Sequence, residues 1–196
     1  MYGNPSDLDK ICKIAKEKNL YIIEDIAQAH LASYNNKIVG NFGDVSCLSF
    51  YPSKNLGALG DAGNLITNSK KIYMNAVKFA NYGSLNFKDK NHTTIGINSR
   101  MDELQASFLL EKIKYLKSET KKRIKLANIY NKICKKIKIK TIKVTENSIN
   151  VYHLYPIIVK NRNNVKKELK RFGINTQIHY ELPIHLQTAF KHLKHK

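Results

Sequence analysis

YIIEDIAQAH (residues 21–30) and DVSCLSFYPSKNLGALGDAG (residues 44–63) are two stretches in which a short apolar run ends in polar residues. Short continuous apolar runs that are followed by turn residues are typical of parallel strands buried on both faces. In sheets of this kind, ligands bind beyond the carboxyl ends of the strands. We therefore expect Asp25, from the first stretch, and Lys54, from the second, to face a shared pocket at one edge of a sheet.

Helices and strands alternate on both sides of these two stretches. An S-x-x-D start at Ser6 predicts a helix through LDKICKIAKEKN, and residues 21–24, 45–50 and 63–67 are predicted strands. A further helix is expected over SKKIYMNAVKFANYG, which ends at Gly83. After an irregular loop over residues 85–97, apolar stripes predict two more helices, one from about Ser99 and one over residues 119–137. This alternation indicates the α/β class.

The pattern changes near residue 138. Residues 137–144, 151–159 and 174–180 are predicted strands, and residues 163–172 are a predicted helix, which together indicate a small α+β unit. We therefore predict three parts. Residues 1–118 belong to a large domain, residues 119–137 form a connecting helix, and residues 138–196 belong to a small domain.

The chain is strongly basic, with a net charge of +19 over 196 residues. Arginine occurs only at positions 100, 123, 162 and 171, so 30 of the 34 basic residues are lysines, and they are spread along the predicted helices. Solvated lysine faces on an ordinary fold account for this composition. A basic nucleic-acid-binding protein is the alternative, although the sequence contains no RNA- or DNA-binding motif.

Other features of the composition concern the cellular compartment. No apolar run approaches the ~20 residues that a membrane helix needs, and the sequence begins without the charged-then-apolar pattern of a signal peptide. The three cysteines show neither metal-binding nor redox spacing. We therefore expect reduced thiols, no metal site and a cytoplasmic protein.

The polar residues that follow the two apolar runs suit the chemistry of pyridoxal phosphate. That cofactor needs an amine to hold its aldehyde, a carboxylate to keep its pyridine nitrogen protonated, and donors for its phosphate. Lys54 can supply the Schiff-base amine, Asp25 the carboxylate and Ser49 a hydroxyl for the phosphate, while Ala27 is small enough to lie under the ring and Gln28 can reach the ring hydroxyl. Each residue also has an ordinary structural explanation: a solvated lysine, an aspartate in a turn, a serine bonded to backbone.

Three motifs, EDIAQAH, GDVSCLSFYPSKNLGALGDAG and GINSRMDELQAS, resemble the DegT/DnrJ/EryC1/StrS family of sugar aminotransferases. The later stretches VYHLYPIIV and INTQIHYELPIHLQTAF resemble the small domain of that family in the same order. The resemblance implies an aspartate-aminotransferase-type (fold type I) structure, pyridoxal phosphate as cofactor and a homodimer. It also implies transfer of an amino group, usually from L-glutamate, to a keto sugar carried on a nucleotide diphosphate, for polysaccharide or amino-sugar biosynthesis.

The resemblance also implies roles for single residues. Lys54 ends an S-x-x-x-x-K pattern that begins at Ser49, the phosphate contact, while Asp25 pairs with the pyridine nitrogen and Gln28 lies against the ring. Asn98 resembles the asparagine that reaches the phosphate of the neighbouring subunit's cofactor. Relatives that carry histidine in place of the lysine dehydrate their substrate instead, so Lys54 favours amino transfer. The resemblance further implies substrate-binding roles for Arg100, which suits a carboxylate or diphosphate, and for His179 and Tyr180 near the sugar.

Members of the family are longer than this chain. MYGNPSDLDKI resembles the middle of their large domain, and their small domain continues beyond the equivalent of Lys196. The chain therefore resembles a fragment that lacks the amino-terminal half of the large domain and the carboxyl-terminal end. We expect such a fragment to bind the cofactor poorly by itself. Two alternatives follow: a catalytically inactive remnant, or one part of a protein whose amino-terminal half is a separate chain.

Overall fold

The computed structural model describes residues 1–86, 88 and 91–193. The chain divides into two compact units, Met1–Ile157 and Ile158–Lys196, of which the second is described to residue 193. Within each unit, the residues contact mainly one another. The domain bounds 1–118, 119–137 and 138–196 stay a prediction.

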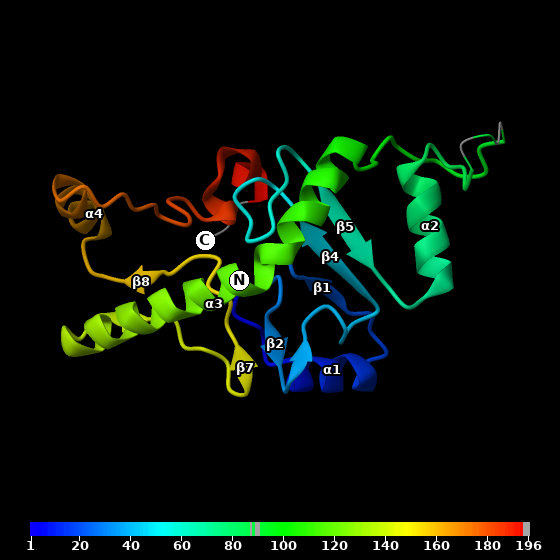
Figure 1. Ribbon diagram of the computed structural model, residues 1–196. Helices are drawn as coiled ribbons and strands as arrows, with labels where there is room; N and C mark the ends of the chain where they lie inside the picture. The colour runs from blue at the N-terminus through cyan, green and yellow to red at the C-terminus, as the bar shows by residue number, and fades with distance from the viewer. Residues whose placement is uncertain (87, 89–90, 194–196) are drawn as a thin grey trace. The chain divides into compact units, whose positions relative to one another are not determined.

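The first unit is built on a sheet of three strands: β1 (Ile23–Asp25), β4 (Val45–Ser49) and β5 (Gly63–Ile66). Their order is β1-β4-β5; β1 and β4 are parallel, and β5 is antiparallel to β4, as Figure 1 shows. The expected parallel pairing of the two apolar runs is therefore confirmed. The carboxyl ends of β1 and β4 meet at one edge, which brings Asp25 and Ser49 to that edge.

The sheet has one covered face and one open face. Side chains alternate along each strand, and the register pairs Ile23 with Val45, Asp25 with Cys47 and Cys47 with Leu65. These residues share a face on which Ile23 is 69% exposed and Leu65 38% exposed. The expectation that both faces are buried is therefore wrong, because the described chain supplies packing elements to one face only. We call this surface the open face; its members are Ile23, Asp25, Val45, Cys47, Ser49 and Leu65.

The opposite face carries the core of the first unit. Glu24 and Ser46 are buried there, and the carboxylate of Glu24 accepts hydrogen bonds of 2.7 Å from the backbone N–H groups of Gly40, Phe42 and Gly43. A buried carboxylate is stable only when its oxygens are satisfied in this way. The adjoining hydrophobic cluster consists of Leu8, Ile26, Ala32, Tyr34, Val39 and Val151.

A second small sheet has the order β3-β2-β7, with β2 at Ser33–Tyr34, β3 at Lys37–Ile38 and β7 at Ser148–Ile149. Asn35 and Asn36 join β2 to β3 with φ values of 46° and 61°. Asparagine tolerates this left-handed backbone better than most residues, which makes it common in two-residue hairpin turns.

Two helices begin with side-chain caps. α1 (Leu8–Glu17) begins after Asp7, whose carboxylate accepts from the Lys10 N–H at 3.3 Å, so the cap lies one residue after the expected Ser6. α2 (Lys70–Ala80) begins after Ser69, whose hydroxyl accepts from the Ile72 N–H, also at 3.3 Å. Such bonds satisfy donors that the first turn of a helix leaves free.

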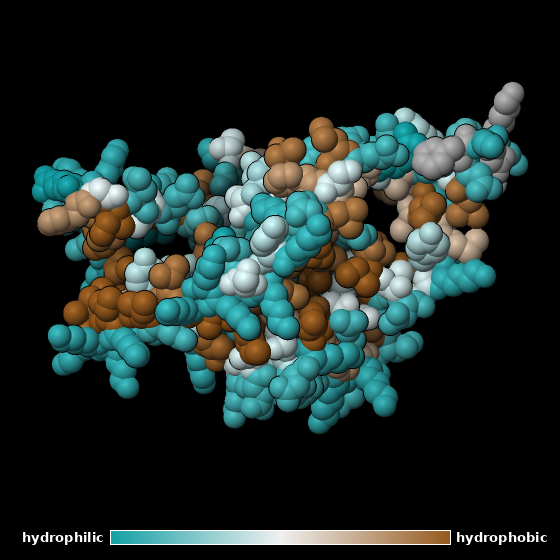
Figure 2. Space-filling view, viewed as in Figure 1, coloured by the Kyte–Doolittle hydropathy of each residue, from teal (hydrophilic) through white to brown (hydrophobic). Residues whose placement is uncertain are grey.

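α3 (Glu103–Lys136) is one continuous helix of 34 residues, so the expectation of two helices is wrong. It begins after Asp102, and the sequence around Ser118 and Glu119 contains neither glycine nor proline to interrupt it. Its amino-terminal half packs through Leu109 and Leu116 against Phe50, Leu56 and Ala58. Figure 2 shows apolar side chains at the surface over its carboxy-terminal half. The exposed apolar residues there are Leu126, Ile129, Tyr130, Ile133 and Ile137.

The remaining elements are short. β6 (Lys140–Thr141) and β8 (Ile157–Ile158) are much shorter than the strands expected over 137–144 and 151–159. α4 (Arg162–Arg171) confirms the helix expected over 163–172, and the 3₁₀ turns η1 (Ile184–Leu186) and η2 (Thr188–Leu193) follow. Residues 174–180 form no strand in the described chain, because no neighbouring strand pairs with them.

The expected loop over residues 85–97 includes 87, 89 and 90, which lie outside the described residues. In the part of the chain that the structure describes, no helix combines the length and apolarity needed to span a membrane.

Candidate functional site

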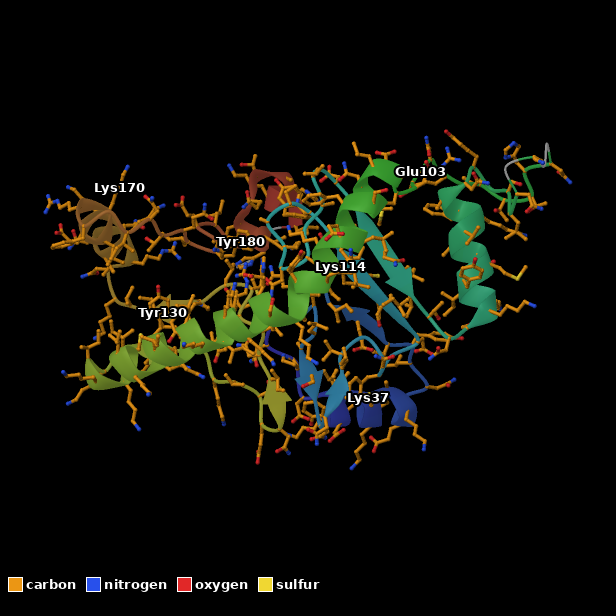
Figure 3. The ribbon with its side chains drawn as sticks, in the orientation of Figure 1. Lys37, Glu103, Lys114, Tyr130, Lys170 and Tyr180 are labelled. Atoms are coloured by element: carbon orange, nitrogen blue, oxygen red, sulfur yellow. The ribbon has the colours of Figure 1, made fainter. Side chains whose placement is uncertain are left out.

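A cavity of about 800 Å³ lies at the carboxyl end of β4. Ser49 ends that strand, and Lys54 follows in the loop that leads toward β5. Asn98 and Arg100, which precede α3, form the opposite wall. Figure 3 labels Glu103, the first residue of α3, immediately after this wall. The full lining is Ser49, Tyr51, Lys54, Asp61, Ala62, Gly63 and residues 98–102.

The loop turns sharply between Ser49 and Lys54. The hydroxyl of Ser49 accepts from the Tyr51 N–H at 3.3 Å, and the Lys54 N–H donates to the Tyr51 carbonyl at 2.9 Å. These bonds fold the chain back over the end of β4. As a result, the half-buried Lys54 lines the same cavity as Ser49.

The opposite wall is held by the end of α2. Asn98 forms an isolated bridge with the buried Asn81. The guanidinium of Arg100 donates to Asn98 Oδ1 at 3.2 Å and to Asn81 Oδ1 at 3.3 Å, and it lies 5.8 Å from the centre of the Tyr82 ring. The positive charge of Arg100 is therefore fixed at the cavity wall, where it can attract an anionic group.

Asp25 lies at the neighbouring strand end. It closes β1 on the open face that also carries Ser49, and its Oδ1 accepts from the Ala27 N–H at 3.0 Å. Gln28 accepts from the Tyr2 N–H at 2.7 Å, which fixes its amide beside the beginning of the chain. Asp25, Ala27 and Gln28 are not among the residues that line the cavity. The structure thus brings Ser49, Lys54, Asn98 and Arg100 together and places the Asp25 group at the adjacent strand end.

His179 and Tyr180 belong to the second unit. Their rings lie 5.3 Å apart in an edge-on arrangement, and Figure 3 shows Tyr180 in the segment before η1. The hydrogen bond from Arg162 Nη2 to the Glu181 carbonyl, at 3.0 Å, ties this segment to α4. A role for the pair in sugar binding stays a prediction.

His30 is a buried neighbour of the site that is not among the predicted site residues. Its ring is 4% exposed and lies 5.8 Å from the Phe50 ring. Burial, together with the positive charge of Lys54, lowers the pKa of His30 to about 4, so the ring is neutral at pH 7. Among the described residues neither ring nitrogen has a hydrogen-bond partner. The available signal was its position directly after EDIAQA.

The side chains present fit pyridoxal phosphate. An amine (Lys54) and a hydroxyl (Ser49) share a cavity with a guanidinium (Arg100), and the hydroxyl and guanidinium are donors suited to a phosphate. A carboxylate closes the neighbouring parallel strand on the same face of the sheet. The cavity volume lies in the range of cofactor sites, roughly 300–1,000 Å³. The described residues contain no cluster of histidine, cysteine and acidic side chains that could hold a metal ion.

Comparison with known proteins identifies the family of the chain. The model of the DegT/DnrJ/EryC1/StrS aminotransferase family matches residues 1–196. The chain is 42% identical over 190 residues to a dTDP-3-amino-3,6-dideoxy-alpha-D-galactopyranose transaminase of Aneurinibacillus thermoaerophilus, covering 97% of this chain and 52% of the relative. It is 37% identical over 189 residues to a UDP-2-acetamido-2-deoxy-3-oxo-D-glucuronate aminotransferase of Pseudomonas aeruginosa, covering 96% and 52%.

The fold agrees as well. The crystal structure of S. venezuelae DesV in complex with a ketimine intermediate superposes with a TM-score of 0.93 at 34% identity, covering 98% of this chain and 52% of DesV. This likeness confirms the expected fold over the matched half. The chain spans about half the length of the relatives it matches. Because the family model matches the whole chain, the protein belongs to the DegT/DnrJ/EryC1/StrS aminotransferase family.

Proposed function

We propose that this chain serves a pyridoxal-phosphate-dependent aminotransferase that moves an amino group from L-glutamate to a nucleotide-linked keto sugar. The observation that carries the proposal is the shared cavity of Ser49, Lys54 and Arg100 in a chain of this family. The names of the Pseudomonas and Aneurinibacillus relatives support a nucleotide-linked sugar as substrate.

The cofactor, when bound, supplies a protonated ring that withdraws electrons from the carbon bearing the amino group. Lys54 would hold the cofactor through its side-chain amine and, as a free amine, would move a proton at the substrate carbon as acid and base. Asp25 keeps the pyridine nitrogen protonated, and Ser49 donates to the phosphate. Ala27 and Gln28 contact the ring.

The other named residues bind anionic groups and sugar. Asn98 donates to a cofactor phosphate, which by family resemblance belongs to the neighbouring subunit of a homodimer. Arg100 suits the carboxylate of glutamate or the diphosphate of the sugar nucleotide. His179 and Tyr180 contact the sugar. We place the reaction in the cytoplasm, in polysaccharide or amino-sugar biosynthesis, with neither membrane nor nucleic acid as a partner.

The open face bears on how the site is completed. Relatives are about twice as long as this chain, and apolar residues on the open face are exposed. We propose that the remaining half of the family fold covers this face. Without it, the cofactor site has only part of its walls.

Capture of the cofactor by Lys54 tests the proposal. The purified chain is incubated with pyridoxal phosphate, alone and with a polypeptide made of the half of DesV that this chain does not match, and then reduced with borohydride. Peptide mass mapping should find the cofactor fixed to Lys54, more strongly when the added half is present. Lys54→Ala should abolish the label, and the exposed-helix variant Lys71→Ala should retain it. Label spread over many lysines, or unchanged in Lys54→Ala, contradicts the proposal.

A catalytically inactive fragment is the second candidate, favoured by the half-length match and the open face. It predicts that Lys54 captures the cofactor but that glutamate and a keto sugar nucleotide produce no amino sugar, with or without the added half. The net charge of +19 alone favours a third candidate, a basic nucleic-acid-binding protein. That candidate predicts salt-dependent binding to arbitrary DNA.

A further inference from the structure

The loop that carries Lys54 is held by side chains from outside it. We call residues 51–60, between β4 and β5, the lysine loop. Lys112 Nζ donates to the Gly57 carbonyl at 2.9 Å, and Gln105 Oε1 accepts from the N–H groups of Leu59 and Gly60 at 2.8 and 3.1 Å. These two residues of α3 fix the second half of the loop, beyond Lys54.

The first half of the loop is fixed by the residue next to Lys54. Asn55 Nδ2 donates to the Val151 carbonyl at 3.4 Å, and Asn55 Oδ1 lies 3.1 Å from Nδ1 of His153. An amide oxygen only accepts hydrogen bonds, so Nδ1 of His153 must carry the proton and donate. His153 is 9% exposed, so this bond is shielded from water.

The segment that receives Asn55 is itself rigidly placed. Val151 is completely buried, and its N–H donates to the Gly3 carbonyl at 3.1 Å. Gly3 has a φ of +90°, and a Cβ there would lie 2.9 Å from the Tyr152 nitrogen, so the two segments touch without side-chain space between them. Residues 150–153 therefore provide a fixed point for the loop. Of these residues, His153 lies 98 positions after Asn55 in the sequence.

We propose that Asn55 and His153 are a pair of positioning residues that set where the Lys54 amine stands. The inference rests on the proposed function, in which Lys54 holds the cofactor. The N–H of Lys54 donates a hydrogen bond to the Tyr51 carbonyl, and the hydrogen bond between Asn55 and His153 fixes the residue that follows Lys54. With its own N–H bonded and the following residue held, the backbone of Lys54 keeps one direction, so the amine is aimed before the cofactor arrives.

Amide hydrogen exchange tests the pair without any cofactor. Asn55→Leu and His153→Phe remove the bond from either side, and the double variant removes both partners. Because a buried hydrogen bond is worth about 0.5–1.5 kcal/mol, the Lys54 and Ala58 amides should exchange roughly 2- to 10-fold faster in each single variant. The double variant should match Asn55→Leu, because that variant already removes the bond to His153 together with the bond from Asn55 Nδ2 to the Val151 carbonyl. Exposed Asn128 on α3 gives the control, Asn128→Leu, which should leave the loop unchanged.

Asn55→Asp retains an oxygen that accepts from His153 but loses the amide that donates to the Val151 carbonyl. Its loop amides should therefore exchange more slowly than those of Asn55→Leu, and exchange in α1 reports whether each variant is folded. Unchanged exchange in Asn55→Leu, or effects of the single variants that add in the double variant, would overturn the inference.

Borohydride fixation of the cofactor provides the second readout. In His153→Phe with the added DesV half, fixation to Lys54 should be slower at the same cofactor concentration, and the affinity for inorganic phosphate should be unchanged. Fixation at the parental rate contradicts the positioning role. If the parent itself never captures the cofactor, the proposed function fails, while the exchange result still decides whether the pair holds the loop.

Discussion

At the scale of single residues, the site combines groups that the sequence marks and groups that only the fold reveals. Lys54 and Ser49 stand in a recognisable motif, and the structure places both at one cavity. His30 and His153 could not be assigned from sequence. The surroundings of His30 depend on Phe50 and Lys54, and the partner of His153 lies 98 positions away. Contacts of that kind follow from tertiary packing rather than from local pattern.

The neutral state of His30 predicts a pH dependence of stability. The pKa of His30 is lowered to about 4 in the fold, below the 6.5 of the free side chain, so the unfolded chain binds the proton more readily. The free energy of unfolding is therefore unaffected by the titration of His30 above pH 6.5 and falls as the pH decreases toward 4, by an amount on the order of 3 kcal/mol. Denaturant unfolding of parent and His30→Leu over this range should show a steeper loss in the parent. Parallel curves would contradict the prediction.

Glu24 should matter for stability although it is remote from the proposed chemistry. Its carboxylate accepts three backbone N–H bonds at 2.7 Å. In Glu24→Gln, an amide NH₂ replaces one acceptor and opposes a buried N–H, which should lower the free energy of unfolding by about 1.5–3 kcal/mol. Glu17→Gln, on the exposed end of α1, is the control and should change it by less than about 0.5 kcal/mol. Thermal or urea unfolding measures both.

At the scale of elements, the sequence predicted types better than lengths. α1, α2, α4, β4 and β5 lie close to their expected positions, because apolar spacing and caps are local signals. α3 continues past residue 118 because nothing there interrupts a helix, although its apolar stripes suggested two. The expected strand over 174–180 is absent from the described chain because a strand needs a partner as well as a suitable sequence.

The lysine loop should tolerate substitution unevenly. A Cβ at Gly57 would lie 2.4 Å from the Pro52 carbonyl oxygen, whereas at Gly60 it would meet only the flexible amide of Gln105, at 3.2 Å. Gly57→Ala must displace backbone and should lower the free energy of unfolding by about 1–3 kcal/mol. The same variant should also lose capture of the cofactor at Lys54. Gly60→Ala, in the same loop, should cost less. Equal losses in the two variants would mean that the loop is not packed as described.

At the scale of the whole molecule, a substitution on the open face should affect the stability of this chain and its association with another polypeptide differently. Ile23 is 69% exposed on that face, so Ile23→Asp should change the free energy of unfolding of the chain alone by less than about 0.5 kcal/mol. In the proposed assembly the added DesV half covers this face, so the same change would bury a charge there and should weaken the association more than about tenfold. Ile95→Asp, at a 92% exposed position off the sheet, should leave the association unchanged. Analytical ultracentrifugation compares the three proteins.

The arrangement of the cysteines has a practical consequence. Cys47 is an exposed thiol in the middle of β4, whereas Cys134 is buried and burial raises the pKa of the Cys12 thiol, which suppresses its reactive thiolate. An alkylating reagent should therefore modify Cys47 first. The rate of Cys47 alkylation therefore reports whether another polypeptide covers this side of the sheet. The reaction should be rapid in the chain alone and slow when a second polypeptide shields the thiol.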